Sequence, residues 1–139
     1  MRYLLDTNTC IGWLRLSQPN IVVRIKQESP DDIAICSVVV SELIYGIERS
    51  PSAHQANNRH RVEQLRKCFV SLPFEDTAAE HCGKLRALLA NLGTPIGPND
   101  LMIASIALAN GLVLVTHNKA EFDRVPGLTV EDWESSLSQ

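Results

Sequence analysis

The sequence has no long hydrophobic run, and this excludes a membrane-spanning helix. No window of its 139 residues approaches the roughly 18 consecutive apolar residues that such a helix needs. The N-terminal stretch MRYLLDTN has only two leucines before an acidic residue, so it does not predict a secretory signal. We therefore expect a cytoplasmic protein without membrane contact.

Cysteine pairs and an excess of positive charge are also lacking. The four cysteines, Cys10, Cys36, Cys68 and Cys82, form no CxxC pair and have no histidine at a ligand-like spacing, which argues against structural zinc. We expect four reduced and mostly buried thiols. The net charge of −3 argues against a broad basic surface that holds nucleic acid non-specifically. It does not exclude a nuclease, because the active site of a metal-dependent nuclease is itself acidic.

Short apolar segments alternate with helical patterns along the chain. Strands are predicted at residues 2–5, 33–36, 69–72, 112–115 and 128–130. A turn that opens a helix is predicted at 6–16, and further helices at 20–27, 37–49, 53–68, 76–92 and 99–110. Ser37 is predicted to cap the helix that follows the second strand. The alternation predicts a single α/β domain over residues 1–139 with a mainly parallel sheet, and such sheets place their sites beyond the carboxyl ends of the strands.

Three carboxylates are predicted to lie near the carboxyl ends of the strands, where parallel sheets form their functional sites. Asp6 ends the first strand, in LLDTN. Glu42 follows the second strand, in SELIYGI, where a solvated side chain paired with Arg49 is the alternative interpretation. Asp100 opens the almost wholly apolar helix NDLMIASIALAN. Its alternative role is to interact with the helix dipole, but a charge beside so buried a helix is costly unless a cation pairs with it.

Further oxygen ligands follow the late strand, in THNKAEF. They are Thr116, Asn118 and Glu121, for which a helix cap at Asn118 and an ordinary surface glutamate are the alternatives. Together with the three carboxylates they form a hard oxygen donor set that suits Mg²⁺ or Mn²⁺. Such ions activate water and stabilise charge during phosphodiester cleavage.

The ordered set LLDTN, SELIYGI, IGPNDLMIAS and LVTHNKAEF, followed by RVPGLTVEDW, resembles PIN-domain ribonucleases and in particular VapC-type toxins of bacterial toxin–antitoxin pairs. The resemblance runs from Tyr3 to Trp133. It implies an α/β/α sandwich and Mg²⁺- or Mn²⁺-dependent endoribonuclease activity. It also implies a homodimer that a VapB-type antitoxin inhibits within a larger hetero-oligomer.

The resemblance also assigns roles to individual residues. It implies that Asp6 and Asp100 are the principal metal ligands and that Glu42 completes the acidic pocket. Many family members have Asp at the position of Asn118, so the number of metal ions stays open, and Glu121 could supply the missing carboxylate. The residues that would orient carboxylates or water are Thr7, Asn8 and Thr116.

A basic segment at residues 54–67 offers contacts for RNA phosphates. Its candidates are Arg59, Arg61, Arg66 and Lys67, and a solvated helix face is the alternative interpretation. Aromatic residues make up only 5% of the chain, which leaves few side chains for stacking on bases. A folded RNA such as a tRNA is therefore a better candidate substrate than an unstructured strand.

Two other functions remain open at the level of the sequence. One is a phosphatase that uses Asp6 as nucleophile, but haloacid-dehalogenase-like enzymes place a second Asp two residues later, where this chain has Asn8. The other is a catalytically weak or inactive PIN-like module that acts only by binding a protein. The missing charge at Asn118 supports this second alternative, and the presence of Asp6, Glu42 and Asp100 argues against it.

Overall fold

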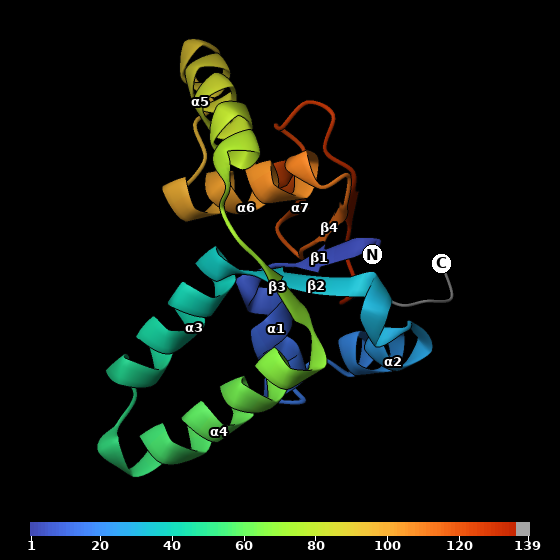
Figure 1. Ribbon diagram of the computed structural model, residues 1–139, viewed down its shortest axis with the longest axis vertical. Coiled ribbons are helices and arrows are strands. Elements are labelled where there is room, and N and C mark those ends of the chain that lie inside the picture. The colour runs from blue at the N-terminus through green and yellow to red at the C-terminus, as the bar shows by residue number, and fades with distance from the viewer. Residues whose placement is uncertain (136–139) are drawn as a thin grey trace.

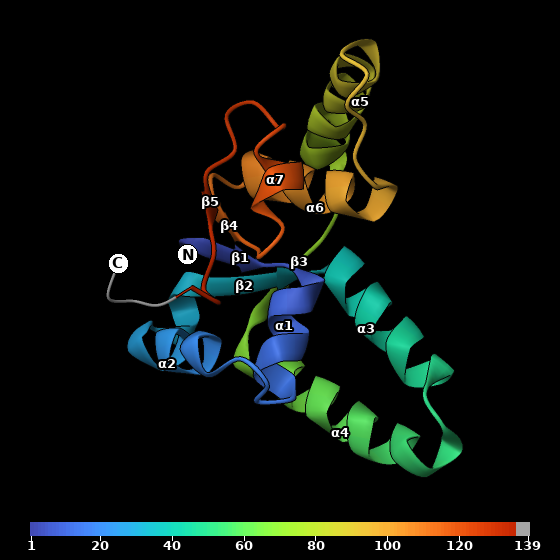
Figure 2. The same cartoon turned by 180° about the vertical axis from the view of Figure 1, so that it is seen from behind.

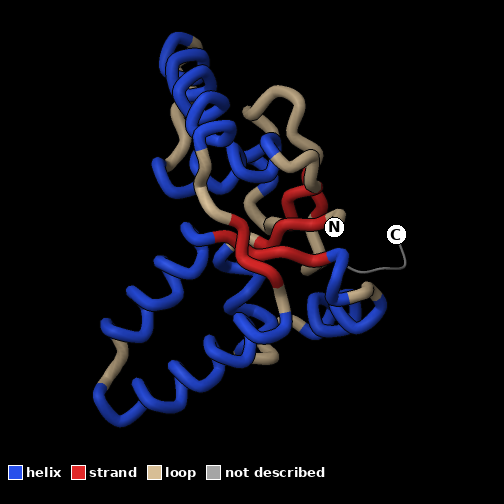
Figure 3. Tube along the Cα trace, viewed as in Figure 1, coloured by secondary structure: helices blue, strands red, loops and turns tan. Residues whose placement is uncertain are grey.

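The computed structural model describes residues 1–135, and residues 136–139 lie outside the described part. Its strands form one sheet in the order β3-β2-β1-β4-β5, and every strand pair is parallel (Figures 1 and 3). The strands are β1 Tyr3–Leu5, β2 Ile33–Cys36, β3 Val70–Leu72, β4 Val113–Val115 and β5 Val130–Glu131. The α-helices are α1 Thr7–Leu14, α2 Pro19–Gln27, α3 Ser37–Arg49, α4 Ser52–Cys68, α5 Asp76–Asn91, α6 Pro98–Ala109 and α7 Lys119–Phe122. The predicted α/β fold with a parallel sheet is confirmed.

β1 lies at the centre of the sheet. It pairs with β2 on one side, with Tyr3 opposite Ile33, and with β4 on the other, with Leu5 opposite Val115. All three of its residues are buried, as expected for an apolar central parallel strand. The chain proceeds outward from β1 through β2 to β3, and it later returns on the opposite side as β4 and β5. The strand order therefore reverses between β1 and β4, and ligand sites in open parallel sheets form at such a reversal.

Two helical layers cover the sheet. Figures 1 and 2 show α1, α2 and α4 on one face and α6 and α7 on the other, and α5 packs against α6. Helices α3 and α4 pack together and project beyond the sheet. Helices α1 and α3 begin directly after β1 and β2, so their N-termini lie at the carboxyl edge of the sheet.

The C-terminal segment returns to the centre of the sheet. The buried ring of Trp133 packs edge-to-face on Tyr3, with 5.0 Å between the ring centroids. Arg24 of α2 stacks over Trp133 at 4.8 Å and forms an ion pair with Glu131 at 3.3 Å. These contacts hold the chain after β5 beside the loop after β4.

Several local predictions need correction. Ser37 is not a cap, because α3 begins at Ser37 itself and its N-cap is Cys36, which makes no side-chain capping bond. The thiol of Cys68 is exposed rather than buried, since it ends α4 on a solvated face, whereas Cys10 and Cys36 are buried. Helix α7 lies in a segment where a helix was considered only through the alternative of a cap at Asn118. Within residues 1–135, no helix has the length and apolar character to cross a membrane.

Candidate active site

Asp6 connects the central strand to the first helix. It follows β1 directly and is the N-cap of α1, where its Oδ1 accepts a hydrogen bond from the Thr9 backbone N–H at 2.9 Å. Only 6% of Asp6 is exposed. Asp6 therefore accepts a backbone N–H that would otherwise lack a partner in the first turn of α1, and it places a carboxylate at the carboxyl edge of the sheet.

The surroundings of Asp6 act on its charge in opposite directions. Burial raises its pKa, hydrogen bonds from Thr116 and Thr9 lower it, and the neighbouring carboxylate of Glu42 raises it again. Thr116 is itself buried, and its hydroxyl oxygen accepts the backbone N–H of Asn118 at 3.0 Å. Thr9 is anchored by a hydroxyl bond to the Val115 carbonyl at 3.2 Å. Both threonines thus fix Asp6 relative to the end of β4.

Glu42 projects from α3 toward Asp6. The hydroxyl of Thr7, the first residue of α1, donates a hydrogen bond to Glu42 Oε1 at 2.5 Å. The pair with Arg49 that was considered from the sequence does not form, because Arg49 donates to the hydroxyl of Tyr45 at 3.0 Å. Glu42 is half-buried and held by α1, so it is not a freely solvated surface glutamate.

Asp100 lies in the first turn of α6, on the opposite helical layer. Burial and the carboxylates of Glu121, Asp6 and Glu42, in that order, raise its pKa to about 7. The charges that act most strongly on Asp100 are those of carboxylates. Carboxylates crowded in this way retain protons until a cation compensates them.

Glu121 of α7 completes this group. Its Oε1 accepts the backbone N–H of Gly97 at 3.1 Å, and its Oε2 accepts the side-chain amide of Asn118 at 2.5 Å. Gly97 immediately precedes α6, and a Cβ built on it would lie 4.0 Å from an oxygen of both Asp100 and Glu121. Asn118 is the N-cap of α7 but makes no capping bond with its side chain. It holds Glu121 beside Asp100 instead.

The structure brings together most of the residues that the sequence singled out. Four carboxylates from different helices converge at one edge of the sheet, and we call this group the acidic pocket: Asp6, Glu42, Asp100 and Glu121. Thr7 and Thr116 bind two of these carboxylates. Asn8 does not, since it is exposed and its side chain makes no hydrogen bond within residues 1–135. Sequence reasoning missed Thr9, although its position three residues after an N-cap Asp is a usable signal.

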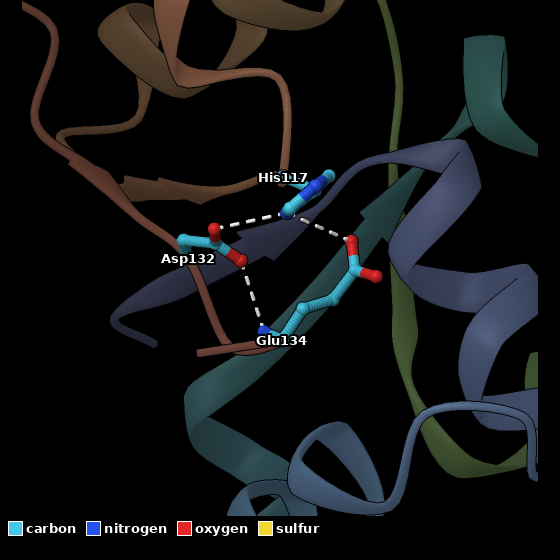
Figure 4. A group of neighbouring side chains, drawn as sticks. All are labelled: His117, Asp132 and Glu134. Atoms are coloured by element: carbon cyan, nitrogen blue, oxygen red, sulfur yellow. Dashed lines mark hydrogen bonds and ion pairs between the residues drawn. The ribbon is translucent and has the colours of Figure 1, made fainter. Parts of the chain in front are cut away.

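A second cluster lies beside the acidic pocket and was not predicted (Figure 4). His117 Nδ1 lies 3.0 Å from Asp132 Oδ2 and 3.2 Å from Glu134 Oε2. Within residues 1–135, this is the only trio of histidine, cysteine or acidic side chains whose ligand atoms all lie within 4.8 Å of one another. The bond to Asp132 and the charge of Glu134 raise the pKa of His117. We interpret the cluster as an ion pair that joins the loop after β4 to the C-terminal segment. The four carboxylates of the acidic pocket, all within residues 1–135, contain no trio with ligand atoms this close to one another.

The basic residues of α4 point in different directions. Arg59 pairs with Glu48 at 3.1 Å, and Arg66 lies 4.0 Å from Glu63. Lys67 is exposed, with no ionic partner among the described residues. Arg61 instead lines a groove of about 130 Å³ between α1, α3 and α4. We call it the arginine groove, and its lining includes Ile11, Leu14, Arg15, Glu42, Asn58 and Arg61. Glu42 belongs to both the groove and the acidic pocket.

Comparison with known proteins assigns this arrangement to a family. The profile of the PIN domain matches residues 3–128. The chain belongs to the PIN-domain family. This PIN domain is 41% identical to the tRNA(fMet)-specific endonuclease VapC of Salmonella typhimurium, over 96% of this chain and 98% of that protein. It is 34% identical to Ribonuclease VapC2 of Rickettsia felis, over 96% of this chain and 99% of that protein.

Chains in solved VapBC structures have nearly the same fold as this PIN domain. DNA-bound VapBC from Salmonella typhimurium contains a chain with a TM-score of 0.89 and 41% identity, covering 96% of this chain and 98% of that one. VapBC-1 from nontypeable Haemophilus influenzae contains a chain with a TM-score of 0.86 and 32% identity, covering 97% and 100%. The resemblance read from the sequence motifs is therefore confirmed.

Proposed function

We propose that this protein is a divalent-metal-dependent endoribonuclease and the toxin of a VapBC-like pair. The observation that carries the proposal is the acidic pocket, in which burial and the carboxylates of Glu121, Asp6 and Glu42 raise the pKa of Asp100 to about 7. The relatives from Salmonella typhimurium and Rickettsia felis are named as an endonuclease and a ribonuclease, which supports the same activity. In this proposal residues 1–139 form one PIN domain that acts in the cytoplasm, where RNA is present.

The donor set of the pocket fits a hard divalent cation. Asp6 is almost fully buried, and the pKa of Asp100 is raised to about 7, so both carboxylates need a compensating positive charge. Asp6 and Asp100 would hold Mg²⁺ or Mn²⁺, with Glu42 and Glu121 contributing directly or through water. The bound ion would make a water molecule more acidic and stabilise charge on the phosphate.

The protein residues supply orientation and a proton acceptor. Thr7 fixes Glu42 at the edge of the pocket, from which its carboxylate can orient the attacking water or accept its proton. Burial raises the pKa of Asp6, and the hydrogen bonds from Thr116 and Thr9 oppose this rise and hold the carboxylate in place. Gly97 and Asn118 hold both oxygens of Glu121.

Asn118 bears on the alternative of an inactive binding module. The amide lacks the charge of an aspartate, but it binds Glu121 and places that carboxylate next to Asp100. Four carboxylates therefore surround the pocket despite the substitution. This favours an active enzyme over a module that acts only by protein binding.

The arginine groove offers a path for the RNA backbone away from the acidic pocket. Arg15 and Arg61 line it, and neither side chain has a hydrogen-bond or ionic partner within residues 1–135. Arg59 and Arg66, by contrast, face Glu48 and Glu63. We therefore assign phosphate contacts to Arg15 and Arg61. The Salmonella relative is named as a tRNA(fMet)-specific endonuclease, which supports a structured RNA as substrate.

The arginine groove is also a suitable binding surface for an inhibitory antitoxin. The relatives solved as VapBC complexes support a VapB-type partner for this chain. Ile11 and Leu14 give the arginine groove an apolar floor on which antitoxin side chains can pack. An antitoxin arginine that reached the acidic pocket would replace the cation and block RNA. Homodimer formation stays a prediction from the family resemblance.

The direct test incubates the purified protein with total bacterial RNA in Mg²⁺, Mn²⁺ or EDTA and maps the new ends by sequencing. Asp6→Asn is a suitable variant, because asparagine also caps helices and so preserves the first turn of α1. Asp123→Asn is the matched control at an exposed position. We expect discrete cuts that require the metal and Asp6 and that persist in the control variant. Equal cleavage by wild type and Asp6→Asn would overturn the proposal.

A further inference from the structure

A second hollow adjoins Asp6, on the side of α1 that faces the C-terminal segment. Its volume is about 320 Å³, and Asp6 forms part of its wall. Its other polar lining residues are Asn8, Ser17, Gln18, His117, Asn118 and Glu134. We call it the amide pocket because three of these side chains are amides.

Local backbone geometry directs Gln18 into this pocket. The chain leaves α1 through Leu16, which has a positive φ of 54°, and the Ser17 N–H then bonds to the Gly12 carbonyl at 3.1 Å. Gln18 thereby lies directly over Gly12. A Cβ at Gly12 would lie 3.0 Å from both Gln18 Cγ and Ile21 Cδ1, closer than about nine in ten real contacts of this kind. The absence of a side chain at Gly12 is therefore what allows Gln18 to pack there.

The fold does not use the side-chain amide of Gln18. Gln18 is the N-cap of α2, but its side chain makes no capping bond, and only its backbone carbonyl accepts the N–H groups of Ile21 and Val22. Helix N-caps favour Ser, Thr, Asp and Asn, so capping does not explain a glutamine here. Within residues 1–135, the side chains of Asn8 and Ser17 also lack hydrogen-bond partners. Three neighbouring polar side chains are thus available to a ligand.

The opposite wall of the pocket is fixed. Asp132 and Glu134 hold the ring of His117 through Nδ1, as Figure 4 shows. The backbone carbonyl of Glu134 also accepts the side-chain amide of Asn20 on α2 at 2.9 Å. The pocket is therefore a formed depression between two restrained walls.

The charges around the pocket restrict what it can bind. No lysine or arginine lines it, and two carboxylates, Asp6 and Glu134, do. His117, its single basic side chain, is already paired with acidic partners. A phosphate would be repelled, whereas a neutral flat group that both donates and accepts hydrogen bonds would match the amides. The edge of a nucleobase is such a group.

We propose that the amide pocket binds the base of a nucleotide next to the phosphate cleaved at Asp6, and that Gln18 pairs with the edge of this base to select the cleavage sequence. This assignment rests on the proposed ribonuclease function. RNA then lies across α1, with its phosphates toward Arg15 and Arg61 on one side and one base in the amide pocket on the other.

Binding of the base can be measured without cleavage. The ¹⁵N-labelled full-length protein, free of metal, is titrated with each of the four ribonucleoside 5′-monophosphates and with ribose 5-phosphate. We expect one base to shift the side-chain amide signal of Gln18 at a concentration at least about fivefold lower than the other bases. Ribose 5-phosphate should leave the signal in place. No shift with any nucleotide, or an equal shift with ribose 5-phosphate, would overturn the assignment.

Selection by the pocket can be measured on a pool of stem–loop RNAs with randomised loops. We expect the wild type to prefer one base beside the cut by about tenfold or more, and Gln18→Ala and Gly12→Ala to reduce this preference to about threefold or less. Cleavage at the favoured base should fall more than cleavage at the disfavoured bases in both variants, which separates lost selection from general damage. The control Gln64→Ala, at an exposed glutamine outside the pocket, should cleave like the wild type.

The two measurements separate this inference from the proposed function. Cleavage by the wild type without base preference, or with a preference that survives in Gln18→Ala, contradicts the amide pocket and leaves the nuclease intact. A specific shift of the Gln18 amide in a protein that cleaves no RNA supports the pocket and contradicts the nuclease.

Discussion

The hydroxyl of Thr7 donates a hydrogen bond to Oε1 of Glu42, and this contact joins residues 35 positions apart. It connects the first residue of α1, next to Asp6, with the side of α3 that faces the acidic pocket. Glu42 makes no other side-chain hydrogen bond within residues 1–135. Its orientation toward the pocket therefore depends on this hydroxyl.

Thr7→Val tests the contact with little change in shape. We expect the rate of RNA cleavage to fall about tenfold, which corresponds to the loss of a hydrogen bond to a charged group. The melting temperature should change little, because Thr7 lies at the surface end of α1. Thr77→Val, at an exposed position in α5, is the control. Full activity in Thr7→Val would show that Glu42 needs no orientation by Thr7.

The stability of the metal-free protein should depend on pH through Asp100. Its pKa is about 7 in the folded protein against an unfolded value near 3.8, because burial and then the carboxylates of Glu121, Asp6 and Glu42 favour its neutral form. The folded state therefore binds the extra proton, and the free energy of unfolding decreases as the pH rises through about 7. The metal-free protein should melt at a higher temperature at about pH 5 than at about pH 8.

Added Mn²⁺ separates Asp100 from His117 in that measurement. The raised pKa of His117 also gives stability that is lost as the pH rises, so the two groups act in the same direction. A cation in the acidic pocket should remove the part due to Asp100 and stabilise the protein most at high pH. Differential scanning fluorimetry with and without Mn²⁺ measures this, and a pH profile that Mn²⁺ does not alter would contradict it.

Asn118→Asp should make the fold more dependent on metal. The new carboxylate would lie against Glu121 Oε2, where an amide now donates a hydrogen bond. We expect a lower melting temperature without metal and a larger increase on adding Mn²⁺ than in the wild type. An unchanged response to Mn²⁺ would place Asn118 and Glu121 outside the cation site.

Arg61 and Arg59 should differ in RNA binding although they are two residues apart on α4. Arg61 lines the arginine groove with Glu42, whereas Arg59 is paired with Glu48. Binding is measured as a function of salt in an Asp6→Asn background, so that RNA is not consumed. Arg61→Gln should lower the slope of log K against log salt by about 1, and Arg59→Gln should leave it unchanged. Equal effects of the two substitutions would show that α4 presents a solvated face without specific phosphate contacts.

The sequence predicts those parts of the site that depend on local pattern. An apolar strand that ends at Asp6 and an apolar helix that begins at Asp100 are visible in the sequence, and parallel strand alternation brings their ends to one edge of the sheet. The bond from Asn118 to Glu121 depends on the three-residue spacing within a short helix that was not predicted. That helix is only four residues long, too short to show a hydrophobic period.

Other features depend on packing between distant elements. The His117 cluster forms because Trp133 packs on Tyr3 and so brings the chain after β5 back to the sheet. No local sequence pattern predicts this packing. The basic residues of α4 were grouped by composition, but Arg59 and Arg61 lie about 200° apart on the helix. Which of them is paired depends on how α4 packs against α3, and this is a property of the folded protein.

Mn²⁺ binding and RNA cleavage, measured on the same preparations of wild type and Asp6→Asn, test the central claim most directly. Calorimetry reports the binding, and sequencing of RNA ends reports the cleavage. The acidic pocket as described predicts that Asp6→Asn remains folded, binds Mn²⁺ at least about tenfold more weakly, and makes no metal-dependent cuts. Unchanged Mn²⁺ affinity, or cleavage that persists in the variant, would contradict it.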